Sequence, residues 1–220
     1  NHSVTVSSEG MGTLKFSGHG GSSATSSIDG TVAGDIWDGF NSAVATTVTG
    51  QTVSASGGIN NSMFYTLPEM MDGLSLFASY NPQVPGTSEA ELGYGLTYTG
   101  VEGLSFSYAI NDENTGVTGT SGEQTAWKAT YAYGPVTVGM SNNDFDVGAT
   151  GTDQETDSYS IAYTVSDELS ISYGTEEIST SGKAVNSEYS AIVATYTAGG
   201  LTLTGKMEEA ENVDGTTTAS

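Results

Sequence analysis

The amino-acid sequence predicts an all-β protein, a transmembrane antiparallel up-and-down β-barrel. Three observations lead to this prediction: a tyrosine that recurs about every 33 residues, runs of alternating polar and apolar residues, and connections that alternate between short and long. A fixed period of this length indicates one supersecondary unit used repeatedly, and here that unit is a long β-hairpin. The recurring tyrosines are Tyr65, Tyr98, Tyr131, Tyr163 and Tyr196.

Alternating runs and turn residues mark twelve candidate strands along the chain. Most are longer than the ~5–6 residues of an average soluble strand, and their length suits a tilted strand that crosses a bilayer, which needs ~9–11 residues. The expected strands are residues 3–8, 12–18, 60–67, 74–81, 88–99, 104–111, 123–133, 136–143, 156–165, 169–178, 187–197 and 201–208.

The polar side of each alternating run is built from small residues. In residues 91–98, for example, Leu92, Tyr94 and Leu96 share one face, and Gly93 and Gly95 lie on the other. A soluble β-sandwich also alternates, but its solvent face usually carries Lys, Glu and Arg rather than Ser, Thr and Gly. The tyrosines end their strands, where a membrane barrel has its interfacial girdle. The pattern therefore favours a barrel over a sandwich.

Connection lengths agree with this fold. Short turns are expected at 99–103, 134–135, 166–168 and 198–200, and longer connections at 112–122, 144–155, 179–186 and from 209 onward. Outer-membrane barrels have short periplasmic turns and long external loops. One connection breaks the period, because residues 19–59 contain no comparably strong strand pattern. Irregular connections of this length are uncommon and usually functional.

Composition excludes several functions. The chain has 26 acidic residues, four lysines and no arginine, with a formal charge of −22, so it lacks the basic face that nucleic acid needs. There is no cysteine, hence no disulfide or thiolate metal site. No Gly-x-Ser-x-Gly, His-Glu-x-x-His or phosphate loop is present. The sequence therefore predicts neither an enzyme nor a bound cofactor.

Two runs beside the long connection carry a family resemblance. Residues 12–19 read Gly-Thr-Leu-Lys-Phe-Ser-Gly-His, and residues 61–74 read Asn-Ser-Met-Phe-Tyr-Thr-Leu-Pro-Glu-Met-Met-Asp-Gly-Leu. These runs and the repeat resemble the Gram-negative general diffusion porins, in particular the acidic porins of marine alphaproteobacteria. The resemblance implies an outer-membrane location, a 16-stranded barrel, a homotrimer, and a long loop that folds inward and narrows the pore.

This resemblance also implies where the chain lies within the fold. If residues 12–18 precede the constriction loop, they form the fifth strand, and the chain runs from the fourth strand to the fifteenth. Residues 1–220 are then a single β-barrel domain that is incomplete at both ends, with residues 19–59 as its constriction loop. The alternative is a barrel of twelve strands that closes on itself.

The expected pore-constriction residues lie on and beside the long connection. They are Lys15, His19, Asp29, Asp35 and Asp38. Lys128 and Lys206 are expected to face the lumen, since a lysine that faces the middle of the lipid costs roughly 2–4 kcal/mol. Barrels place charges inside whatever their function, so the lysines do not by themselves prove a constriction. An excess of acids at a narrow mouth enriches cations, and we therefore expect weak cation selectivity.

Acidic residues are also frequent in the expected external loops. Clustered carboxylates can bind Ca²⁺ or Mg²⁺, and such an ion could bridge to lipopolysaccharide phosphates. No EF-hand spacing is present, so a solvated acidic rim is the simpler interpretation. The weak metal candidates are Asp144, Asp146, Asp153 and Glu155.

The function predicted from the sequence is passive diffusion of small hydrophilic solutes and ions through a water-filled channel in the outer membrane. One alternative is a solute-specific channel, for which Trp37 and Phe40 are the only aromatic candidates. The other is a non-conducting surface protein, either an adhesin-like barrel or a structural envelope protein. The position of residues 19–59 distinguishes these alternatives, because a constriction loop must fold against the inner face of the barrel.

Overall fold

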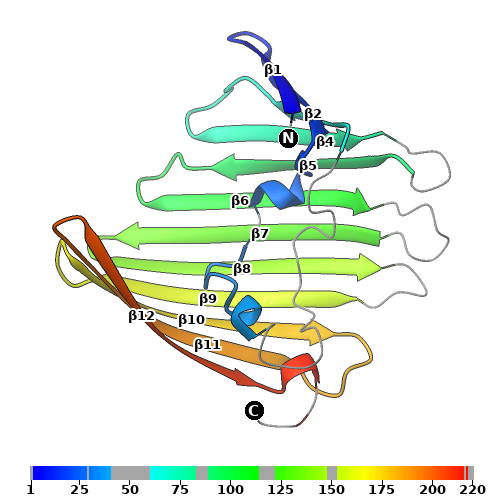
Figure 1. The fold of residues 1–220 in the computed structure, drawn as a ribbon. Helices are drawn as coiled ribbons and strands as arrows, with labels where there is room; N and C mark the ends of the chain where they lie inside the picture. The colour runs from blue at the N-terminus through cyan, green and yellow to red at the C-terminus, as the bar shows by residue number, and fades with distance from the viewer. Residues whose placement is uncertain are drawn as a thin grey trace. The chain divides into compact units, whose positions relative to one another are not determined.

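A computed structural model describes residues 2–28, 30–40, 60–82, 89–113, 122–147, 153–215 and 217. These residues form twelve strands in one sheet, and the order of strands in the sheet follows their order in the chain (Figure 1). Every strand pair whose register is defined is antiparallel. The predicted all-β, up-and-down fold and the predicted number of strands are therefore confirmed.

The strands are β1 (His2–Ser8), β2 (Gly12–His19), β3 (Ser62–Thr66), β4 (Leu74–Asn81), β5 (Glu91–Tyr98), β6 (Leu104–Glu113), β7 (Gly122–Tyr133), β8 (Val136–Val147), β9 (Gln154–Thr164), β10 (Leu169–Thr180), β11 (Ser187–Ala198) and β12 (Leu201–Glu211). Three short 3₁₀ helices accompany them: η1 (Thr25–Ile28), η2 (Ile36–Phe40) and η3 (Val213–Gly215). No helix within the described residues is long and apolar enough to cross a membrane.

The chain divides into two compact units. Unit 1 comprises Asn1–Asp29, Thr52–Trp127 and Asn143–Asp153, and unit 2 comprises Gly30–Gln51, Lys128–Asn142 and Gln154–Ser220. Strands β1 to β6 belong to unit 1 and β9 to β12 to unit 2, while β7 and β8 contribute residues to both.

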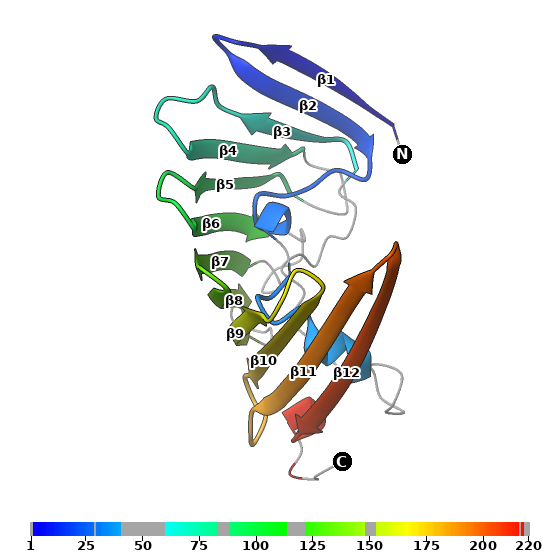
Figure 2. The same ribbon diagram turned by 90° about the vertical axis from the view of Figure 1, so that its left-hand side faces the viewer.

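In unit 1, helix η1 lies against β5 and β6 (Figure 2). Ala24 and Ile28 pack there against Phe77, Ala109 and Ala126, and all five are buried. We call the side of the sheet that carries Phe77 and Ala109 the covered face of unit 1. Small residues on this face allow the chain to approach the sheet closely.

Unit 2 has an equivalent arrangement, in which η2 contacts β10, β11 and β12. Ile36 is fully buried in a cluster with Ile178, Tyr189 and Ala210. The side of the sheet that carries these residues is the covered face of unit 2. Each unit therefore has a small apolar core that depends on residues from the long connection between β2 and β3.

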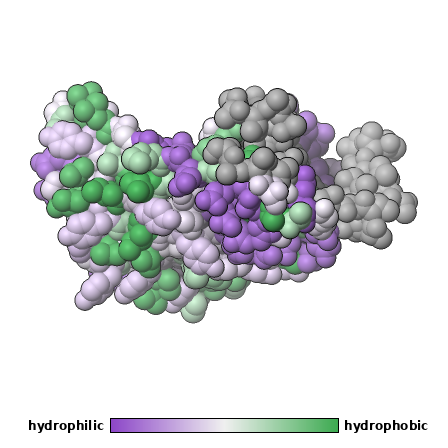
Figure 3. Space-filling model, turned by 90° about the horizontal axis from the view of Figure 1, so that it is seen from below, coloured by the Kyte–Doolittle hydropathy of each residue, from purple (hydrophilic) through white to green (hydrophobic). Residues whose placement is uncertain are grey.

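The other side of each unit exposes large apolar side chains, and Figure 3 shows hydrophobic and hydrophilic side chains gathered in separate areas of the surface. In unit 2, Ile171, Tyr173, Ile192, Leu203 and Met207 are 43 to 74% exposed. Residues directly opposite each other on neighbouring antiparallel strands share a face of the sheet. Ile171 lies opposite Ala194, and this pair is on the other face from Ile178 and Ala191, which belong to the covered face. Water would not favour such a surface, whereas lipid accommodates it.

Several strands extend further than the sequence predicted. β8 continues to Val147, β10 to Thr180 and β12 to Glu211, because backbone pairing does not require the apolar alternation that marked the expected ends. The prediction that Asp144, Asp146 and Glu155 lie in loops is consequently wrong. β3 is shorter than expected, since Asn61 has φ 58 and this left-handed conformation interrupts the strand.

Candidate functional site

The candidate site is formed where the long connection packs on the sheet. In unit 1, the backbone N–H of Ala24 donates to Oγ of Ser79 (2.8 Å), and Oγ1 of Thr25 donates to Oε1 of Gln124 (3.0 Å). A Cβ added to Gly93 would lie 2.9 Å from Cβ of Ala24. Residues 22–28 therefore rest directly on the sheet, donate hydrogen bonds to β4 and β7, and have a glycine beneath Ala24.

The same construction recurs in unit 2. The backbone N–H of Val32 donates to Oγ of Ser141 (3.1 Å), and that of Ala33 donates to Oγ of Ser158 (3.2 Å). A Cβ on Gly174 would lie 2.7 Å from Cβ of Ala33, which is closer than real side chains come. The Gly and Ser residues that the sequence placed on the polar face thus provide space and hydrogen-bond acceptors for residues 30–40.

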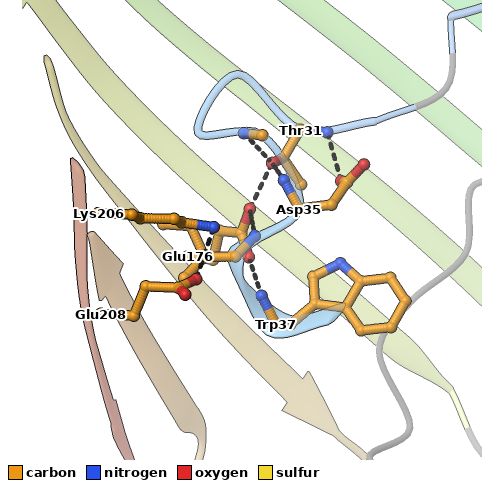
Figure 4. Close-up of polar contacts among 8 residues, drawn as sticks. Thr31, Asp35, Trp37, Glu176, Lys206 and Glu208 are labelled. Atoms are coloured by element: carbon orange, nitrogen blue, oxygen red, sulfur yellow. Dashed lines mark hydrogen bonds and ion pairs between the residues drawn. The ribbon is translucent and has the colours of Figure 1, made fainter. Parts of the chain in front are cut away.

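Glu176 of β10 makes the strongest polar contact with this segment (Figure 4). Glu176 is only 2% exposed. Oε1 accepts from the backbone N–H of Ile36 (3.0 Å) and from Oγ1 of Thr31, and Oε2 accepts from the backbone N–H of Trp37 (3.0 Å). A buried carboxylate is costly unless donors compensate it, and here three donors converge on one side chain.

The loop that presents these donors is closed by its own side chains. Oγ1 of Thr31 accepts from the backbone N–H groups of Gly34 (3.1 Å) and Asp35 (3.0 Å), and Oδ1 of Asp35 accepts from the backbone N–H of Thr31 (2.9 Å). Asp35 has φ 53, a left-handed conformation that Asp tolerates better than most residues. The turn at residues 31–35 is therefore fixed before η2 begins.

Two lysines of unit 2 lie close to the segment. Nζ of Lys206 and Oε1 of Glu208 form an ion pair of 2.6 Å on β12 (Figure 4). Glu208 in turn lies beneath η2, because a Cβ on Gly39 would be 3.0 Å from its Oε1. A Cβ on Gly30 would be 3.2 Å from Oδ2 of Asp35 and 3.8 Å from Nζ of Lys128. Both acidic and basic side chains of the sheet therefore lie close to residues 30–40.

The predicted constriction residues divide between the two units. Lys15 pairs with Phe64 in the β2–β3 register and so lies on the covered face of unit 1, and His19 is exposed at the end of β2. Asp35 and Asp38 belong to the unit 2 segment, together with Lys128 and Lys206 of the sheet. Asp29 lies outside the described residues. That these residues form a constriction stays a prediction.

The recurring tyrosines lie near the short turns. Tyr98 pairs with Leu74 and Phe106, and Tyr196 pairs with Leu169. Tyr131, Tyr163 and Tyr196 are 42 to 48% exposed. Tyr65 donates from Oη to the backbone O of Met11 in the β1–β2 turn (2.5 Å). Their role as an interfacial girdle stays a prediction.

The acidic residues proposed for metal binding do not assemble into a metal site in the described part of the chain, which contains no group of three or more His, Cys, Asp or Glu side chains that could hold an ion. Asn142 Nδ2 instead donates to Oε1 of Glu155 (2.8 Å) and to Oδ1 of Asp157 (3.0 Å). Acids do line up across unit 2 on the face opposite the covered one. The row consists of Asp157, Glu177, Glu188 and Glu211, each directly opposite the next.

The two aromatic residues suggested for a solute-specific channel are both engaged in packing. Phe40 packs on Tyr189 in a tilted arrangement, with ring centroids 5.6 Å apart and an angle of 43° between the rings, and Trp37 packs against the cluster around Ile36. Both are half-buried in this packing, so the structure adds nothing in favour of that alternative.

Sequence reasoning missed the residue that holds the segment most firmly. The predicted strand 169–178 contains Glu176, which follows Ser170, Ser172 and Gly174 on the polar face of β10, but the sequence pattern assigns it no role. A carboxylate two positions after a glycine, on a face otherwise made of small residues, is the signal that could have found it. Its partners are 139 to 145 residues away in the chain, and no local pattern could identify them.

Comparison with known proteins agrees with the fold. A family model described as Gram-negative porin matches residues 1–215. A search of curated proteins finds no match. The chain is similar to a porin refined at 1.8 Å resolution, with 14% identity, a TM-score of 0.69, and coverage of 94% of this chain and 75% of that one.

Two further solved structures are similar over a comparable length. One is OmpF of Salmonella typhi in complex with daunomycin (14% identity, TM-score 0.62, covering 96% of this chain and 70% of that one). The other is OmpT, an outer membrane protein of Vibrio cholerae (15% identity, TM-score 0.61, covering 96% and 69%). At these identities the structures support the fold, and the family match supports the assignment. The chain belongs to the Gram-negative porin family, whose place is the bacterial outer membrane.

Proposed function

We propose that this porin is a water-filled channel for the passive diffusion of small hydrophilic solutes and ions, that residues 22–40 narrow it, and that it is weakly selective for cations. The observation that carries the proposal is the packing of residues 30–40 on the covered face, with Glu176 bound to their backbone and carboxylates beside them. A segment held in this way occupies space on the inner side of a barrel wall.

Charge supports the cation preference. Asp35 and Asp38 are carried by the segment itself, and Lys206 is already paired with Glu208 at 2.6 Å. An ion pair contributes little field at a distance, so the excess of acids decides the sign of the local potential. A narrow passage lined by negative charge raises the local concentration of cations.

The proposed partners follow from the family. We propose a homotrimer in which the acidic row of unit 2 lies near the headgroups of the outer leaflet, where lipopolysaccharide phosphates and divalent ions are present. Coordination of a metal ion by the protein is not part of this proposal, since diffusion through a water-filled channel needs no bound metal or other cofactor.

The test is a planar-bilayer measurement on the full-length protein. We expect single-channel conductance and, in a KCl gradient, a reversal potential of the sign that indicates cation preference. Asp35→Asn and Asp38→Asn, which keep the side-chain shape, should each reduce that potential, whereas Glu102→Gln in the β5–β6 turn should leave it unchanged. Absence of conductance would favour a non-conducting surface protein, and anion preference would contradict the charge argument.

A further inference from the structure

We propose that Glu176 is a positioning residue: it holds residues 31–37 on the covered face of unit 2 and thereby sets how far this segment narrows the channel. The inference rests on the proposed channel function, and it adds a residue of the barrel wall that controls the width of the passage from beneath the segment.

The hydrogen bonds of Glu176 point to this role. Although it belongs to β10, its three donors come from the segment, namely Thr31, Ile36 and Trp37. Its neighbours directly across the sheet are Ser158 and Tyr189, and Oγ of Ser158 itself accepts from the segment at Ala33. The carboxylate therefore serves the attachment of the segment rather than the pairing of the sheet.

The donors also require both carboxylate oxygens as acceptors. A hydroxyl has one proton and two lone pairs, and Oγ1 of Thr31 already accepts from the backbone N–H groups of Gly34 and Asp35. Its proton must therefore go to Oε1 of Glu176, which also accepts from Ile36, while Oε2 accepts from Trp37. A glutamine has only one oxygen, and its amide group would face an N–H. Glu176 is thus matched to the segment by chemistry and not only by shape.

The neighbouring contacts leave the attachment dependent on this side chain. Val32 and Ala33 rest on small residues of the sheet and are half-buried, and their two serine hydrogen bonds are neutral. Bonds to a charged acceptor are roughly twice as strong as neutral ones. Ile36 fixes the start of η2 in its apolar cluster. Glu176 binds the Thr31 hydroxyl before Asp35 and the backbone N–H groups of Ile36 and Trp37 after it.

Trp37 provides a direct probe of segment position. The chain contains two tryptophans, so in a Trp127→Phe background Trp37 is the single tryptophan. Glu176→Gln is the test variant in full-length protein, and Glu177→Gln is its matched control, because Glu177 is the next residue of β10, lies on the opposite face and carries the same charge. Acrylamide quenching of Trp37 and hydrogen exchange at the Ile36 and Trp37 amides report the attachment without reference to conduction.

We expect Glu176→Gln to increase quenching and to accelerate exchange at these amides by roughly tenfold or more, because a charge-assisted attachment is lost, and to change single-channel conductance. Glu177→Gln should do none of this. If the two variants behave alike, Glu176 does not position the segment. If Trp37 is released but conductance is unchanged, the control of channel width is refuted.

A second variant covers the case in which Glu176→Gln does not fold. Thr31→Val removes one donor to Glu176, together with the acceptor of the Gly34 and Asp35 N–H groups, and leaves the Ile36 and Trp37 bonds, so it should shift quenching and exchange in the same direction. No shift in Thr31→Val would overturn the proposal. A wild-type protein that does not conduct would refute the proposed channel function, while quenching and exchange would still decide whether Glu176 holds the segment.

Discussion

Gly174 of β10 lies directly beneath Ala33, so that a Cβ added to Gly174 would be 2.7 Å from Cβ of Ala33. The absence of a side chain at this position is what allows the segment to reach the sheet. The same relationship links Gly93 with Ala24 in unit 1 and Gly139 with Val32 in unit 2. The glycines of the polar face are therefore part of the mechanism that positions residues 22–40.

Gly174→Ala is expected to displace residues 32–34 and to destabilise the protein. Overpacking of this kind costs about 1–3 kcal/mol, and Ala33 offers only backbone and Cβ atoms that cannot move aside independently. Trp37 quenching and the urea midpoint measure the two effects. Gly205→Ala in β12 is the control, since nothing lies within 4 Å of its added Cβ, and it should be neutral or slightly stabilising. Equal behaviour of the two variants would contradict the close contact.

Ile36→Ala is expected to cost about 2–5 kcal/mol, because Ile36 is fully buried and its removal leaves a cavity in the cluster of unit 2. Ile192→Ala deletes the same atoms from a side chain that is 48% exposed and should cost less in detergent solution. Unfolding in urea compares the two. A loss for Ile36→Ala no greater than that for Ile192→Ala would show that η2 contributes little to stability.

Glu188→Gln is expected to stabilise the protein. Glu188 lies directly between Glu177 and Glu211 in the acidic row, and like charges directly opposite each other on a sheet are destabilising, by roughly 0.2–1 kcal/mol for a pair. The gain in thermal stability should shrink as salt is added, since the row is exposed to solvent and its repulsion is screened. A gain that does not depend on salt would assign the effect to something other than charge.

The number of strands, their pairing order and the face on which Ser and Gly lie could be predicted from the sequence. Each of these follows from the local alternation of polar and apolar residues along a strand. The sequence did not contain the ends of β8, β10 and β12, where backbone pairing continues into segments with polar or charged side chains. It also did not reveal that Glu176 binds Thr31 and Trp37. That contact depends on how a connection between β2 and β3 meets a strand far along the chain, and alternation carries no signal for it.

Variants of the Lys206–Glu208 pair test whether local charge produces the proposed cation selectivity, with little change in structure. Lys206 and Glu208 have side chains 39% and 26% exposed, and such pairs contribute about 0–1 kcal/mol to stability. Lys206→Gln leaves Glu208 uncompensated beneath η2 and should increase cation preference. Glu208→Gln should decrease it. The double variant should return the reversal potential close to the wild-type value, because the pair as a whole carries no net charge. A double variant that retains the shift of either single variant would show that the selectivity arises from a rearranged segment and not from the local potential.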